Sequence, residues 1–135
     1  MRLAIVASEF NREITDRMVE RALARAEERG VRVTSVVRVP GVFEIALAVQ
    51  RLFERADIDG AVAIGAVIKG ETFHDEALMA AVPRALIDIG LRAGKPVSLG
   101  ITGPGMTDAQ AVERIDKGAD AVDAALAMHE LLRGL

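Results

Sequence analysis

The chain has 135 residues, of which 51% are hydrophobic, and it carries a formal net charge of −3. This length fits a single domain over residues 1–135 that buries about two-thirds of its unfolded surface, and it is too short for two separate cores. The charge argues against a general binder of nucleic acids or acidic membranes, and the absence of cysteine together with only two histidines argues against thiolate or multi-histidine metal sites.

The N-terminal sequence MRLAIVASEF begins an alternation of strand and helix patterns. Its apolar stretch is too short for a secretory or membrane-spanning segment, so we expect a cytoplasmic protein that does not enter a membrane. Periodicity predicts strands at about residues 2 to 7, 31 to 39, 60 to 68 and 95 to 101, and helices at about residues 12 to 29, 43 to 55, 73 to 92 and 107 to 133. This order indicates an α/β fold, specifically a flavodoxin-like three-layer sandwich with a four-stranded parallel sheet and helices on both faces.

The first and last predicted helices each carry an apolar stripe that we expect to face the core. The stripes consist of Ile14, Met18, Ala22 and Ala26 in the first helix and of Ala111, Ile115, Ala119, Val122 and Leu126 in the last. Pro83 lies inside the third helix, where it removes a backbone hydrogen bond and should kink or divide that helix. The GPGM sequence at residues 103 to 106 predicts a turn, and Thr107 and Gln110 have the spacing of a capping box that starts the last helix.

Unusual residues follow all four predicted strands. The four segments are SEFN at residues 8 to 11, VPGVFE at 39 to 44, GAVIKGETFH at 65 to 74, and GITGPGMT at 100 to 107. In open α/β sheets, ligands bind outside the carboxyl ends of the strands, so we expect these segments to share one location.

The third of these segments continues to residue 76 as GAVIKGETFHDE and combines several features of an active site. Gly70 is expected to allow a sharp turn from the strand into a helix that begins near Thr72. Free backbone N–H groups at a helix start favour a phosphate or carboxylate ligand, and His74 can carry protons near neutral pH. The segment therefore predicts a phosphate site beside a proton carrier.

Four ordered motifs give the chain a resemblance to a known family over almost its whole length. They are FN at residues 10 to 11, PGVFEIALA at 40 to 48, GAVIKGETFHDE at 65 to 76, and QAVER at 110 to 114. With these motifs the chain resembles the lumazine synthases of riboflavin biosynthesis, in particular their archaeal branch. The resemblance implies condensation of 5-amino-6-ribitylamino-2,4(1H,3H)-pyrimidinedione with 3,4-dihydroxy-2-butanone 4-phosphate to 6,7-dimethyl-8-ribityllumazine, phosphate and water, without a cofactor or metal.

The same resemblance implies roles for individual residues. His74 would be the catalytic proton carrier, and the substrate-binding positions would be Phe10, Asn11, Val42, Phe43, Glu44, Ala66, Val67, Ile68, Gly70, Glu71, Thr72, Leu99 and Arg114. Phe10 would cover the pyrimidine ring, because a flat heterocycle gains from an aromatic face. Asn11, Phe43 and Glu44 would hold the ribityl chain, and the main chain of residues 66 to 68 would read the pyrimidine edge.

The phosphate would lie between two parts of the chain under this resemblance. Residues 70 to 72 would offer backbone N–H groups and a hydroxyl, with the Glu71 carboxylate turned away or paired with Lys69. Arg114 would add charge-assisted hydrogen bonds from its guanidinium. Gln110, on the same helix, is instead expected to be occupied by the capping box.

Each of these residue types also has a simpler interpretation. Phe10 could be a core phenylalanine, and Asn11 and Glu44 could cap a helix or lie in a solvated first turn. His74 and Arg114 could be solvated surface residues, as we expect for His129. Asp75 is expected mainly as a partner of the helix dipole, although it lies close enough to orient His74.

Other functions remain open at this point. A homologous archaeal riboflavin synthase fits less well, because the GETFH and QAVER segments are intact. A non-catalytic flavin- or phosphate-binding flavodoxin-like module is the alternative from another class, and a structural shell protein is a third. The resemblance also implies homo-oligomers, either a pentamer or a pentamer-based capsid, and the sequence does not distinguish between these assemblies.

Overall fold

Strands and helices alternate along the chain, as the sequence predicts. A computed structural model of the protein describes residues 1–70 and 74–135. Its elements are β1 (Arg2–Ser8), α1 (Arg12–Glu28), β2 (Arg32–Val39), the 3-10 turn η1 (Val42–Glu44), α2 (Ile45–Phe53), β3 (Gly60–Ile68), α3 (His74–Ala93), β4 (Val97–Met106), α4 (Asp108–Glu113) and α5 (Lys117–Arg133). None of the described helices is long and apolar enough to cross a membrane.

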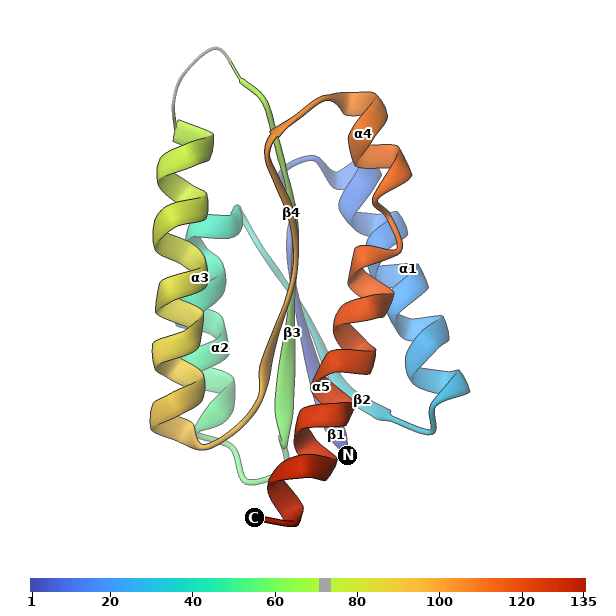
Figure 1. Ribbon diagram of the computed structural model, residues 1–135, viewed down its shortest axis with the longest axis vertical. Coiled ribbons are helices and arrows are strands. Elements are labelled where there is room, and N and C mark those ends of the chain that lie inside the picture. Colours follow the sequence, from blue (N-terminus) through green and yellow to red (C-terminus); the bar gives the residue numbers. More distant parts are fainter. Residues whose placement is uncertain (71–73) are drawn as a thin grey trace.

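The four strands form one parallel sheet in the order β2-β1-β3-β4. Figure 1 shows α2 and α3 on one face of this sheet and α1, α4 and α5 on the other. Alternate residues of β1 accordingly enter two different cores, because Leu3 and Ile5 pack toward α1 and α5 while Ala4 and Val6 pack toward α2. The prediction of an α/β flavodoxin-like three-layer sandwich is confirmed.

Both central strands are buried almost throughout, because helices cover each face. Every residue of β3 from Gly60 to Val67 is buried, which explains its continuous run of small and β-branched residues. The predicted apolar stripes also face the core. Met18, Ala22 and Ala26 of α1 are at most 1% exposed, and Ile14 packs against them while partly buried.

The fourth strand is longer than predicted. The GPGM sequence at residues 103 to 106, expected as a turn, forms the last part of β4 instead. β4 is an edge strand and pairs only with β3, so the missing N–H of Pro104 takes no hydrogen bond from a second neighbouring strand. Gly103 and Gly105 have φ values of 101° and 71°, which glycine adopts without strain.

The last predicted helix is two helices. α4 ends at Glu113, Arg114 is its C-cap, and α5 begins at Lys117. The capping box is confirmed, since the Gln110 N–H donates to Thr107 Oγ1 at 3.2 Å and the Thr107 N–H donates to Gln110 Oε1 at 3.0 Å. The prediction of one helix over 107 to 133 is therefore wrong. The apolar stripe continues across the break, so the hydrophobic pattern alone does not reveal it.

Pro83 does not divide α3. The helix runs from His74 to Ala93 with the proline inside it, so the loss is confined to the hydrogen bond that residue 83 cannot donate. Val82 and Leu86, on either side of the proline, are 4% and 3% exposed and hold the helix on the sheet. The predicted helix start at Thr72 lies outside the described residues.

Candidate active site

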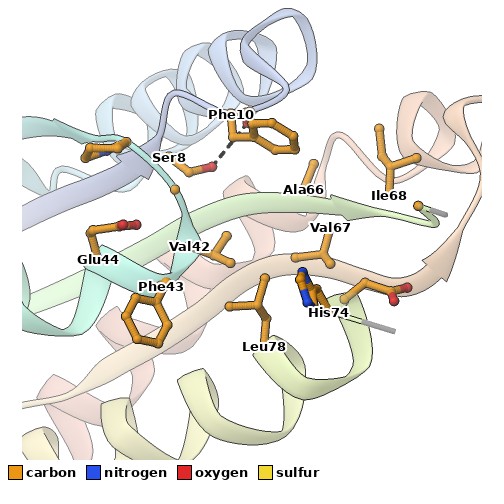
Figure 2. A pocket seen from close by; sticks show the side chains of 14 residues that line it. Ser8, Phe10, Val42, Phe43, Glu44, Ala66, Val67, Ile68, His74 and Leu78 are labelled. Atoms are coloured by element: carbon orange, nitrogen blue, oxygen red, sulfur yellow. Dashed lines mark hydrogen bonds between the residues drawn. The ribbon is translucent and has the colours of Figure 1, made fainter. Parts of the chain in front are cut away.

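A cavity of about 490 Å³ lies at the carboxyl ends of β1, β2 and β3. Figure 2 shows the side chains that surround it. The residues that line this edge cavity are Ser8, Phe10, Pro40, Gly41, Val42, Phe43, Glu44, Ala66, Val67, Ile68, Gly70, His74, Asp75 and Leu78. Three of the four segments expected to converge therefore do so within a single chain.

Phe10 forms one wall of the edge cavity. Its side chain is 70% exposed, so the interpretation of Phe10 as a core residue is wrong. The backbone N–H of Phe10 donates to the carbonyl of Pro40 at 3.1 Å, and its own carbonyl accepts from the Ser8 hydroxyl at 3.4 Å. These bonds hold the backbone of Phe10 beside the ends of β1 and β2, from which its side chain projects into the cavity.

Asn11 connects two segments of the site. It adopts φ 60° and ψ 43° at the N-cap of α1, but its side chain caps no backbone group of that helix. Its Nδ2 instead donates to the carbonyl oxygen of Ala66 at 2.7 Å. The interpretation of Asn11 as a side-chain cap is wrong, and one carbonyl of the segment expected to read the pyrimidine edge is already bonded.

Residues 42 to 44 form the opposite wall of the edge cavity. Val42 is buried at 7% exposure, whereas Phe43 is 72% exposed and Glu44 is also exposed. Glu44 occupies the N-cap position of α2 without a side-chain capping bond. Its carboxylate is therefore available to a ligand, although its exposure also agrees with a solvated first turn.

His74 lies at the described start of α3, where it is exposed and lines the edge cavity. The neighbouring Asp75 Oδ2 accepts the backbone N–H of Gly105 at 3.3 Å. This bond ties the start of α3 to the end of β4, so the described contacts of Asp75 favour a role in the fold over orientation of His74.

Gly70 lines the edge cavity, but its conformation differs from the expectation. Its φ lies outside the left-handed region, and a Cβ built on it would meet nothing within 4 Å. The conformation of Gly70 itself therefore does not require a glycine. Glu71 and Thr72, and with them the expected pairing of Glu71 with Lys69, lie outside the described residues.

Leu99 and Arg114 line a different cavity, of about 470 Å³, which we call the β4 hollow. It lies between β4 and the α4–α5 junction and is lined by Met79, Leu99, Ile101, Thr102, Gly103, Glu113, Arg114, Asp116, Lys117 and Asp120. Within the chain the structure therefore does not bring Arg114 to Phe10 and His74.

The charges of the β4 hollow leave two cations available. Asp116 pairs with Arg21 of α1 at 2.7 Å, and Asp120 lies 3.9 Å from Arg25 of the same helix. Among the described residues, Arg114 and Lys117 form no ion pair within 4.0 Å. The hollow can therefore offer both of these groups to an anion, although the carboxylate of Glu113 also lines it.

Several lining residues were not identified from the sequence. Ser8 lies in the SEFN segment and is 1% exposed, so its place beside Phe10 at a strand end was the available signal. Leu78 lies one helical turn after His74 and faces the same cavity. Lys117 had no signal, because it was expected inside one continuous helix.

Comparison with known proteins shows similarity along nearly the entire chain. The family model described as 6,7-dimethyl-8-ribityllumazine synthase matches residues 1–133. A protein of that name from Methanopyrus kandleri is 49% identical over 135 residues, covering 100% of this chain and 96% of the relative. Proteins of the same name from Sulfolobus acidocaldarius and Methanocaldococcus jannaschii are 49% and 48% identical, covering 98% of this chain and 85% and 94% of the relatives.

Proposed function

The chain belongs to the 6,7-dimethyl-8-ribityllumazine synthase family, and we propose that the edge cavity holds its heterocyclic substrate. The protein is a transferase of riboflavin biosynthesis. It condenses 5-amino-6-ribitylamino-2,4(1H,3H)-pyrimidinedione with 3,4-dihydroxy-2-butanone 4-phosphate and releases 6,7-dimethyl-8-ribityllumazine, phosphate and water.

The observation that carries the assignment of the cavity is its shape and lining. A volume of about 490 Å³ suits one small molecule, and most of the wall is apolar. In Figure 2, Glu44 and His74 lie on opposite sides of the cavity, with Phe10 above the end of β3. A flat ring placed against Phe10 would therefore have a carboxylate on one side and an imidazole on the other.

The wall residues suit the two ends of the heterocyclic substrate. Phe10 offers a face to the pyrimidine ring, and the carboxyl end of β3 at Val67 and Ile68, which lines the cavity, offers backbone groups to its edge. The Glu44 carboxylate can accept hydrogen bonds from ribityl hydroxyls beside Phe43. Asn11 serves this site indirectly, since its amide holds the Ala66 carbonyl.

Arg114 and Leu99 enter this proposal from a second copy of the chain. We place the β4 hollow of one subunit against the edge cavity of the next, in a homo-oligomer that is a pentamer or a pentamer-based capsid in the cytoplasm. Exposed apolar side chains at both cavities support such contacts, since Phe43 of the edge cavity is 72% exposed and Leu99 of the β4 hollow is 37% exposed. Arg114, whose guanidinium forms no ion pair with any residue that the structure describes, would then meet the phosphate.

The reaction itself needs little covalent assistance from the protein. The 5-amino group of the pyrimidinedione attacks the butanone carbonyl, water leaves to form an imine, and enolisation expels inorganic phosphate. The ribitylamino nitrogen then closes the second ring, and a second water leaves. Holding the two reactants together can lower the barrier by about 7–11 kcal/mol, and His74 as proton carrier adds about 10²–10⁴ in rate.

A direct assay tests the proposed site and its reaction. The purified protein is mixed with both substrates, and the absorbance of the lumazine product is followed against a mixture without protein. The wild-type protein should accelerate product formation, and Phe10→Ala should slow it. A non-catalytic flavin- or phosphate-binding module would produce no chromophore above the protein-free mixture, and an unimpaired Phe10→Ala variant would contradict the placement of the ring.

A further inference from the structure

Gly65 is buried near the carboxyl end of β3, at the point where Val42 packs against the strand. A Cβ built on Gly65 would overlap Cγ1 of Val42 and would lie 3.3 Å from the Ser8 hydroxyl and 3.6 Å from Cγ2 of Ile101. Its φ lies outside the left-handed region, so the backbone would accept alanine. The severe overlap at position 65 is therefore with the Val42 side chain, whereas the Ser8 hydroxyl would have to shift only by a few tenths of an ångström.

Val42 is the anchored end of the wall formed by residues 42 to 44. It is 7% exposed, whereas the next residue, Phe43, is 72% exposed and turns toward the edge cavity. A buried β-branched side chain has few alternative rotamers, so it cannot easily swing aside. Displacing Val42 should therefore move the whole wall away from β3 and from Phe10.

We propose that Gly65 is a positioning residue for the substrate site. By lacking a side chain it admits Val42 against β3, and this contact sets the distance between the wall at residues 42 to 44 and Phe10 across the cavity. The inference rests on the proposed function, because the wall is the one that faces the ribityl side chain. Gly65 itself touches no substrate in this arrangement.

The proposed arrangement predicts which ligand loses affinity when Gly65 is replaced. The lumazine product carries the ribityl chain and contacts the displaced wall, so its affinity should fall by about tenfold when the contact is overpacked. Inorganic phosphate contacts the other side of the cavity, near Gly70 and His74, and its affinity should change less than twofold. A general loss of structure would weaken both ligands.

A double-mutant cycle between positions 65 and 42 tests the proposal. Calorimetric titrations with 6,7-dimethyl-8-ribityllumazine and with phosphate are made on the wild type, Gly65→Ala, Val42→Ala and the double variant. In the Val42→Ala background the overlapping methyl group is gone, so Gly65→Ala should reduce product affinity less than twofold. Gly60→Ala provides a matched control at the other end of β3, where a Cβ would meet Met1 Cε at 2.6 Å.

The control should lower the melting temperature without changing product affinity. The proposal is overturned if Gly65→Ala binds the product as the wild type does, if its loss persists unchanged in the Val42→Ala background, or if Gly60→Ala causes the same loss. A wild-type protein that binds no lumazine product would contradict the proposed function instead. The two failures are therefore distinguishable in one series of titrations.

Discussion

Replacement of Asn11 by alanine should destabilise the protein through the loss of one long-range hydrogen bond and through backbone strain. The Asn11 amide donates to the Ala66 carbonyl at 2.7 Å, and Ala66 is 2% exposed. A buried acceptor left without its partner costs about 1–3 kcal/mol. Asn11 also has φ 60°, a conformation that costs an alanine about 1 kcal/mol more.

Two substitutions separate the contribution of the hydrogen bond from that of the backbone strain. Asn11→Ala should lose about 2–4 kcal/mol of unfolding free energy, because it loses the hydrogen bond and strains the backbone. Asn11→Gly should lose only about 1–3 kcal/mol, since glycine adopts a positive φ freely. For a chain of this length, each kcal/mol corresponds to about 3–4 °C in Tm.

Urea unfolding followed by circular dichroism measures both variants. Both are compared at one protein concentration, because the stability of any protein that assembles depends on concentration. The expected order of stability is wild type, then Asn11→Gly, then Asn11→Ala. If Asn11→Gly were as stable as the wild type, the bond between Asn11 and Ala66 would contribute nothing, and its role in holding the end of β3 would be refuted.

Three further predictions concern separate parts of the molecule. His74→Ala should slow turnover by about 10²-fold or more without abolishing it, and full turnover at every pH would show that His74 carries no proton. Arg114→Ala should raise the KM for the butanone phosphate by roughly 10–100-fold and leave the KM for the pyrimidinedione within twofold; equal changes in both would contradict a phosphate role. The side-chain hydrogen bond from Arg2 lowers the pKa of Asp59 from 3.8 to about 2, so the pair stabilises the fold above pH 3.8 and loses this contribution as the pH falls through 2. Because solvent screens the partly exposed pair, Asp59→Asn should cost only about 1 kcal/mol of unfolding free energy at pH 7. Urea unfolding of the wild type and the variant between pH 7 and pH 2 measures this cost. A difference in stability that stayed the same over this pH range would contradict the assignment.

The order of strands and helices was readable from the sequence because two periodicities alternate along it. A parallel sheet covered on both faces requires continuous apolar strands, and β3 supplies one from Gly60 to Val67. The stripe that includes Met18 and Ala22 marked the buried face of α1 in the same way. These patterns depend only on burial, so they predict strands and helices even where the structure of the loops is unknown.

The end of β4 and the break after α4 were not readable. Glycine and proline usually mark turns, but at an edge strand the residues 103 to 106 can follow the sheet without disrupting two neighbours. Ala111, Ile115 and Ala119 stay on one helical stripe, and all three are buried although α4 ends between the first two. The hydrophobic pattern therefore continues where the hydrogen bonding does not.

The part of the candidate site that lies within a single chain was predictable. The rule that ligands bind at the carboxyl ends of parallel strands brought together Phe10, the wall at residues 42 to 44, and His74. It could not place Arg114, because the β4 hollow opens on the other side of β4. The rule also gave no indication that the Asn11 side chain bonds Ala66, since such a bond depends on the left-handed turn at Asn11.

The most direct test is a crystal structure of the assembled protein with 6,7-dimethyl-8-ribityllumazine and phosphate bound. The account predicts the heterocycle against Phe10, the ribityl chain along residues 42 to 44, and the phosphate between Gly70 of that subunit and Arg114 of its neighbour. Density for the lumazine away from the edge cavity, or an Arg114 side chain remote from every edge cavity in the assembly, would contradict it.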